Sequence, residues 1–121
     1  MANHKITIAV DAAGSLTYTD GGGADAKKKH VDQNDRVKWT TTLGNLAILF
    51  KGAASPTPEG AYAAEAGADT DDPKIDKPKK AGVPGETPAQ IEKKNTYTYF
   101  VAIAKADGTV LSQDPDIIID N

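Results

Sequence analysis

Three stretches of the chain place an apolar side chain at every second position, and this alternation most constrains the fold. It is clearest in residues 5–10, 36–42 and 96–104, where β-branched and aromatic residues are frequent. Successive side chains of a strand point to opposite faces, so an alternating segment can bury one face and leave the other in solvent. The alternation therefore predicts strands that share a core.

Further strands are expected in shorter segments. Residues 16–20, 46–50, 110–111 and 116–120 are rich in apolar or β-branched residues, and residues that favour turns separate them. The segment 46–50 is almost continuously apolar and is predicted to be buried on both faces or nearly so. Many short strands with few helical segments indicate an all-β fold, an antiparallel β-sandwich, in one domain spanning residues 1–121.

The predicted core takes one face from each strand. Trp39 is the largest apolar side chain available, and a Trp in an alternating strand is usually buried. The residues expected in the core are Ile6, Ile8, Val37, Trp39, Ile48, Phe50, Tyr97, Tyr99, Val101 and Ile117.

Residues 51–95, here called the insert, differ in composition from the rest of the chain. They are rich in Ala, Gly, Pro, Lys and Asp and contain few large apolar residues. Thr87 followed by Pro88 predicts a short helix over residues 87–93, and residues 58–66 are a second helix candidate. We expect the insert to lie over the sheets with one or two short helices and without adding a strand.

Two segments carry residues of a known framework. Residues 34–39 have the sequence Asn-Asp-Arg-Val-Lys-Trp, and residues 97–101 have Tyr-Thr-Tyr-Phe-Val. The first resembles the Gly-Asp-x-Val-x-Trp strand of cupredoxins, and the second resembles the Tyr-x-Tyr-x-Cys strand of the same family. The resemblance covers roughly residues 30–50 and 96–120. It implies a Greek-key β-sandwich of the cupredoxin type.

The copper ligands of that family are missing from this chain. Leu46 and Val101 occupy the positions of the first His and the Cys, and Ala104 falls near the second His. The chain has no Cys, and Met1 is its only Met. A type 1 copper centre needs a thiolate and two imidazoles. The resemblance therefore implies an apolar plug at that position and no cofactor.

Two histidines are weak candidates for a different metal site. His4 and His30 lie outside the family's ligand positions and far apart in the sequence. A stable zinc site takes three or four ligands. His30 follows a run of three Lys and is expected in an exposed turn. An enzyme or metal carrier that uses a surface site near either histidine is therefore an alternative function, with no catalytic residue identified.

Charge and hydropathy narrow the range of partners. The net charge is -3, with 14 basic and 17 acidic residues, which argues against a general nucleic-acid binder. No segment approaches the roughly 20 apolar residues of a membrane span. If Met1 is the natural start, the absence of a signal-peptide pattern behind it predicts a cytoplasmic protein.

The expected function is that of a non-catalytic binding or interaction module. Its partner is an unknown protein or a second copy of the chain, and a structural, self-associating protein is a further alternative. Recognition on a rigid sandwich usually lies on loops, so the insert is the expected contact element. The charged residues expected at this contact are Lys74, Lys77, Lys79, Lys80, Asp69, Asp71 and Asp72.

Overall fold

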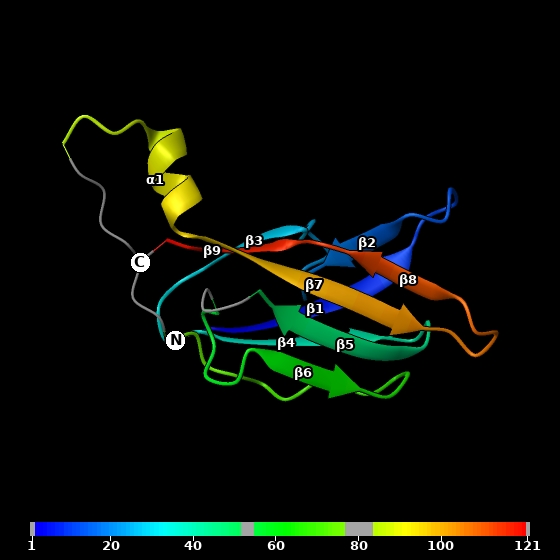
Figure 1. Ribbon diagram of the computed structural model, residues 1–121. Coiled ribbons are helices and arrows are strands. Elements are labelled where there is room, and N and C mark those ends of the chain that lie inside the picture. The colour runs from blue at the N-terminus through cyan, green and yellow to red at the C-terminus, as the bar shows by residue number, and fades with distance from the viewer. Residues whose placement is uncertain (1, 52–54, 77–83, 121) are drawn as a thin grey trace.

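A computed structural model describes residues 2–51, 55–76 and 84–120 of the protein. Within them the chain forms nine strands and one short helix (Figure 1). In chain order these elements are β1 (Asn3–Val10), β2 (Leu16–Thr19), β3 (Lys28–Val31), β4 (Arg36–Thr41), β5 (Asn45–Phe50), β6 (Ala61–Ala64), α1 (Pro88–Lys94), β7 (Thr96–Ala104), β8 (Val110–Gln113) and β9 (Asp116–Ile119). No helix among the described residues is long and apolar enough to cross a membrane.

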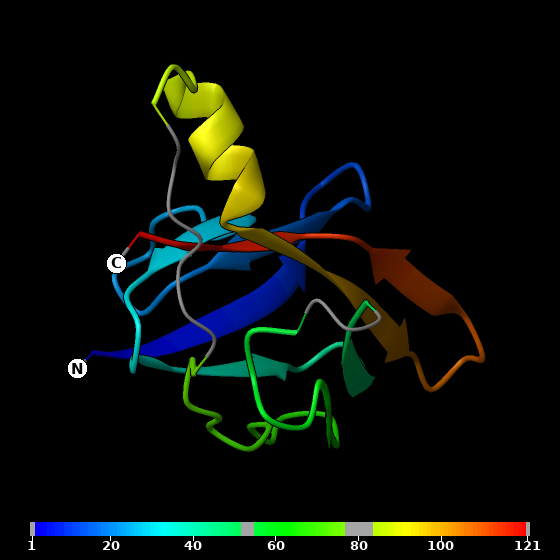
Figure 2. The ribbon, with the colours of Figure 1, turned by 60° about the vertical axis from the view of Figure 1, so that its left-hand side comes forward.

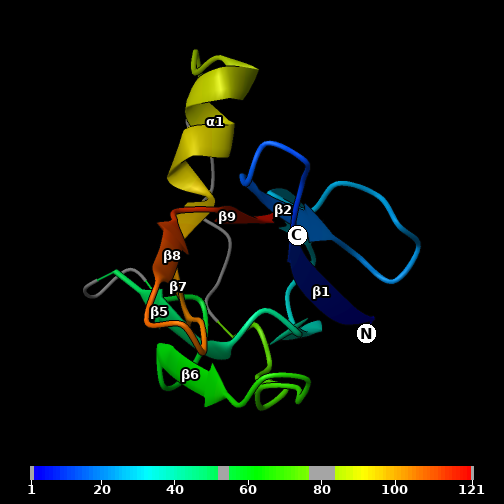
Figure 3. The ribbon, with the colours of Figure 1, turned by 90° about the vertical axis from the view of Figure 1, so that its right-hand side faces the viewer.

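The strands form two packed sheets. Sheet 1 has the order β2-β1-β4, and sheet 2 has the order β3-β9-β7-β5-β6, with β8 also paired to β7. In Figure 1, β8, β7, β5 and β6 lie side by side in front of β1 and β4, and Figure 3 shows the same two layers from the side. The prediction of an all-β fold built from two layers is confirmed.

The prediction of an entirely antiparallel sandwich is wrong. β1 and β4 are parallel, with Ile6 opposite Trp39, and β3 and β9 are also parallel, with Lys29 opposite Ile117. Both pairs join strands that are not neighbours along the chain. The alternation within a strand reports which face is buried and carries no information on the direction of its partner.

The core lies between the sheets, and all ten residues predicted to form it are buried. Trp39 has no exposed surface and lies at its centre. Its ring centroid is 6.1 Å from those of Phe50 and Tyr62 and 5.4 Å from that of Tyr99. Its indole N–H donates to the Tyr99 hydroxyl oxygen at 3.1 Å, which joins sheet 1 to sheet 2. Burial raises the pKa of Tyr99, so this hydroxyl stays protonated.

The insert adds a strand to sheet 2, contrary to expectation. Residues of the second helix candidate form β6, which pairs antiparallel with β5 and places Tyr62 opposite Ile48. The Ala-rich sequence favours a helix locally, but burial of Tyr62 against Trp39 is available only in the strand. The prediction of a helix over residues 58–66 is therefore wrong.

The insert also continues along the open edge of sheet 1. The backbone N–H of Thr70 donates to the carbonyl of Trp39 at 2.9 Å, and that of Ile75 donates to the carbonyl of Asp35 at 2.7 Å. The Ile75 side chain is fully buried. Residues 55–76 of the insert are therefore a packed component of the sandwich and not a cover laid over it.

The predicted helix that begins after Thr87 is confirmed as α1. The Thr87 side chain accepts from the backbone N–H of Gln90, the Gln90 side chain accepts from that of Thr87, and Pro88 begins the helix. This reciprocal capping fixes the helix start. α1 has no buried residue and projects from the end of the sandwich where β1 begins and β9 ends (Figure 2).

Candidate functional site

The positions that match the copper ligands of cupredoxins hold hydrocarbon, but only two of them are in the core. Leu46 and Val101 are 3% and 0% exposed and point between the sheets. Ala104 ends β7 and is exposed. The expectation that all three side chains form one apolar plug is therefore wrong for Ala104, because strand alternation turns it to the outer face, one residue after the buried Ile103.

His4 is bound to a buried carboxylate. Its Nε2 donates to Asp35 Oδ2 at 2.8 Å, and Asp35 is only 4% exposed. Asp35 also accepts from the backbone N–H groups of Ala2 at 2.8 Å and of Asp32 at 3.0 Å. The carboxylate thus ties the start of β1 to the turn before β4. The Asp of the cupredoxin-like motif has a structural role here.

The hydrogen bonds to Asp35 set its ionisation. Burial alone would raise the pKa of this carboxyl, but the bonds donated by Ala2, His4 and Asp32 outweigh burial, and the pKa is lowered. Asp35 is therefore a stable anion at neutral pH. Its oxygens are occupied by three donors, which suits a structural tie better than a proton-transfer group.

We expect the folded protein to lose stability as the pH falls below about 4, and the Asp35→Asn variant to lose less. Because folding lowers the pKa of Asp35, its carboxylate stabilises the folded state above the pKa of the unfolded chain. That contribution disappears as the pH falls through the folded pKa. Urea unfolding from neutral pH down to about 2 measures it.

The exposed Asp71→Asn variant is the control for this pH dependence. It should follow the wild-type curve, whereas the Asp35→Asn variant should be less stable at neutral pH and approach wild type in acid. Parallel curves for wild type and Asp35→Asn at every pH would contradict the assignment.

His30 lies in a strand and not in the expected turn. It belongs to β3, which forms the edge of sheet 2, and its Nδ1 is 2.9 Å from Asp120 Oδ1. The Lys-rich sequence around it suits an edge strand, because charged side chains discourage pairing with other chains. His4 and His30 are on different sheets. In the part of the chain that the structure describes, no three His, Asp or Glu side chains gather as metal ligands.

Asp69, one of the predicted contact residues, belongs to a charged cluster on the outer face of sheet 1. Lys5 Nζ is 3.2 Å from its Oδ1, and Lys38 Nζ is 3.3 Å from its Oδ2. The hydrogen bond from Lys5, assisted by that from Lys38, lowers the pKa of Asp69. Lys5 and Lys38 are direct neighbours across the β1–β4 pair. Asp69 therefore relieves the repulsion between two cations.

The other predicted contact residues are spread along the same edge. The carbonyl of Asp72 accepts from Arg36 Nη1 at 2.9 Å, while Asp71 and Lys74 are exposed. Their role in partner binding stays a prediction. The remaining residues of this set, Lys77, Lys79 and Lys80, lie outside the described residues.

The outer face of sheet 2 is a different kind of surface. Across β6, β5, β7 and β8, its outward side chains are mostly small or apolar, with Asn45 as a polar member, and none is charged. We call this surface the apolar face. Its members are Asn45, Ala47, Leu49, Ala61, Ala63, Phe100, Ala102, Ala104, Val110 and Ser112.

Strand register arranges the apolar face in rows that run across the strands. The middle row contains only small side chains, and the bulky row beside it contains the two largest ones. The end row lies on the other side of the middle row. The middle row is Ala63, Ala47, Ala102 and Ser112, the bulky row is Ala61, Leu49 and Phe100, and the end row is Asn45, Ala104 and Val110.

The side chains of the apolar face are partly exposed, which contradicts the burial predicted for both faces of residues 46–50. Leu49 is 45% exposed and Val110 is 62% exposed, whereas Ile48 on the inner face is fully buried. The segment 46–50 was predicted to be buried on both faces, and that prediction is wrong. In Figure 1 the apolar face is turned toward the viewer, and no labelled element crosses in front of it.

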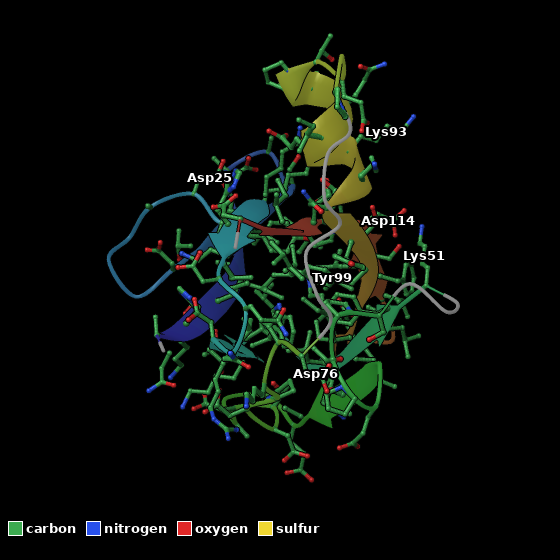
Figure 4. The ribbon with its side chains drawn as sticks, turned by 90° about the vertical axis from the view of Figure 1, so that its left-hand side faces the viewer. Asp25, Lys51, Asp76, Lys93, Tyr99 and Asp114 are labelled. Atoms are coloured by element: carbon green, nitrogen blue, oxygen red, sulfur yellow. The ribbon has the colours of Figure 1, made fainter. Side chains whose placement is uncertain are left out.

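Among the described residues, the charges next to the apolar face lie at its margin. Lys51 Nζ is 3.3 Å from Asp114 Oδ2, and the two side chains are 58% and 49% exposed. Lys51 follows β5 and Asp114 follows β8, so the pair spans β7 beside Phe100. Figure 4 shows Lys51 and Asp114 close together at this margin, with Tyr99 inside the sandwich. At the opposite margin, Glu65 follows β6.

The two outer faces of the sandwich therefore differ in chemistry. Sheet 1 presents Lys5, Arg36 and Lys38 with Asp69, whereas sheet 2 presents hydrocarbon. Comparisons of the chain with protein-family models, curated proteins and solved structures find no match. The strongest functional signal in this chain is thus the exposed apolar face.

Proposed function

We propose that this protein is a non-catalytic, cupredoxin-like interaction module that binds a protein partner through the apolar face. The observation that carries the proposal is an uncharged outer surface on four neighbouring strands, with Leu49 and Val110 about half exposed. Folded monomers rarely expose large contiguous apolar patches, and such patches commonly mark interaction sites. Exposed apolar side chains are unfavourable in water, so burying this face against a partner would lower the free energy.

The cupredoxin-like part of the proposal is supported by where the motif residues lie. Val37 and Trp39 of the first motif and Tyr97 and Tyr99 of the second are all buried between the sheets. Asp35 accepts its hydrogen bonds at the start of the same strand as Trp39. The proposal includes that these strands are connected as a Greek key, as they are in cupredoxins.

The proposal that the protein is non-catalytic is supported by the partners of its two histidines. His4 is held by Asp35, and His30 is paired with Asp120. Among the described residues, each imidazole is hydrogen-bonded to an Asp and neither to a Ser, Thr or Lys that could serve as a nucleophile. A metal carrier at His4 or His30 is the alternative that the next experiment separates.

Adding Cu(II) is expected to give no intense blue form, because the chain has no thiolate ligand and has hydrocarbon at Leu46 and Val101. Visible absorption together with calorimetric titration of Cu(II) and Zn(II) measures this. An intense blue band would overturn the proposal. Stoichiometric binding that disappears in the His4→Ala or His30→Ala variant would favour the metal carrier.

Site-specific photo-cross-linking in cells tests the interaction directly. A benzoyl-phenylalanine at position 102, in the middle row, should give a protein adduct. The same group at position 7, on the outer face of sheet 1, is the matched control and should give none. Equal adducts from both positions, or none from position 102 in a chain shown to be folded, would reject the apolar face as the binding surface.

A further inference from the structure

We infer that the partner of the apolar face is a second copy of this chain, packed face to face about a two-fold axis in a weak dimer. This inference rests on the proposed function and adds the identity of the partner. It follows from the pattern of rows, from the charges at the margin and from the size of the face.

The rows are self-complementary when the two-fold axis lies along the middle row. A face-to-face pair related in this way keeps each strand opposite its own copy and reverses its direction. Every middle-row residue then faces its own copy, so alanine meets alanine. The bulky row then faces the end row, so Phe100 meets Ala104 and Leu49 meets Asn45. The largest side chain of the face thus meets a small one on both sides of the axis.

The charged side chains at the margin of the apolar face are compatible with this two-fold arrangement. Lys51 and Asp114 neutralise one another within each copy. With the axis along the middle row, Asp114 lies opposite the partner's Val110, and Glu65 lies opposite the partner's Ala61. No charged side chain of the margin therefore faces a charge of the same sign. The outer face of sheet 1 would instead place Lys5 and Lys38 of two copies together, which costs free energy.

The size of the face predicts a weak association. Four strands about 4.8 Å apart and three rows about 6.6 Å apart cover roughly 400 Å² on each copy. A standard specific interface buries about 800 Å² on each partner. The dimer should therefore be reversible and depend on concentration, as transient interfaces are. A chain of 12.7 kDa should approach twice that mass as the concentration rises from micromolar to millimolar.

Sedimentation equilibrium with charge variants tests the two-fold arrangement. In the Ala102→Lys variant two ammonium groups would meet at the axis, and in the Ala102→Glu variant two carboxylates would meet. Each variant alone should associate at least about tenfold more weakly than wild type. An equal mixture of the two should recover dimers, because opposite charges then meet. Thr7→Lys, on sheet 1, is the matched control and should sediment as wild type does.

Cysteine cross-linking gives an independent test, because the natural chain contains no Cys. An Ala47→Cys or Ala102→Cys chain should form a covalent dimer with a short bis-maleimide. A Thr7→Cys chain should not. Far-ultraviolet circular dichroism confirms that each variant is folded, and Val110→Lys provides a second disrupting variant at a more exposed position.

The outcomes separate this inference from the proposed function. A wild-type protein that stays monomeric at millimolar concentration overturns the inference, and an adduct between position 102 and a different protein would then preserve the proposed function. A dimer that persists in the Ala102→Lys and Ala102→Glu variants places the contact elsewhere and overturns the inference. If the wild type forms no dimer and position 102 gives no adduct, both the inference and the proposed function are rejected.

Discussion

Replacing Trp39 with Ala should lower the free energy of unfolding by about 3–5 kcal/mol, as truncations of large aromatic side chains in cores do. Trp39 has no exposed surface, and its ring lies within contact of Phe50, Tyr62 and Tyr99. The substitution leaves a cavity that three neighbouring rings can fill only by leaving their own positions. It also leaves the Tyr99 hydroxyl without its indole donor.

Urea unfolding followed by circular dichroism measures this loss, since the variant lacks the only Trp. The Trp39→Phe variant is the control, because it keeps an aromatic ring and removes only part of the volume and the indole N–H. Its loss should be clearly smaller. A wild-type fluorescence spectrum typical of a fully solvated indole would contradict the burial of Trp39.

The Ile75→Ala variant should lose about 2–5 kcal/mol of stability, the usual range for large-to-small changes at buried aliphatic positions. Ile75 is fully buried, and its backbone exchanges hydrogen bonds with the turn before β4: its N–H donates to Asp35, and its carbonyl accepts from Asn34. Ile75 therefore anchors the insert in two ways, with its side chain in the core and its backbone on sheet 1. Urea unfolding measures the loss.

Lys74→Ala is the matched control, since it changes the neighbouring, exposed residue of the same segment. Its effect should stay within about 0.5 kcal/mol. Limited proteolysis of the wild type gives a second measurement, and residues 55–76 should be protected. Rapid cleavage there, with the rest of the sandwich left intact, would show that the insert is not anchored as described.

The inner surface of the fold could be predicted from the sequence because burial leaves a periodic signal. Ile6 and Ile8 in β1, and Val37 and Trp39 in β4, alternate with polar residues and all are buried. Local capping chemistry similarly predicted α1. These features depend on residues close together in the chain, which is why a single sequence contains them.

The features that the sequence did not reveal depend on distant partners. β3 is Lys-rich and forms only because β9 lies beside it. β6 is Ala-rich and forms because β5 offers an edge and Trp39 offers a surface for Tyr62. Sequence propensity alone favours a loop and a helix at these two places.

The apolar face did leave a signal in the sequence. The continuous apolar run in β5 predicts that both faces of this strand are covered within the chain, and the structure shows that only one is. The inner face of β5 is covered by sheet 1, but Ala47 and Leu49 on the outer face meet no second layer among the described elements. A strand that is apolar on both faces indicates two buried faces, and one of them can belong to another molecule.

The pairing of strands far apart in the chain has a consequence for how the protein reaches its native state. β5 pairs with β7 so that Asn45 meets Ala104, and β3 pairs with β9 so that Lys28 meets Asp116. Folding dominated by such distant pairs is slow, typically milliseconds to seconds. On a ribosome that adds about 5–20 residues per second, β5 emerges several seconds before β7. During that interval the edge of β5 that pairs with β7 stays open and its apolar outer face is uncovered, so the nascent chain is most exposed to aggregation before its central sheet can form.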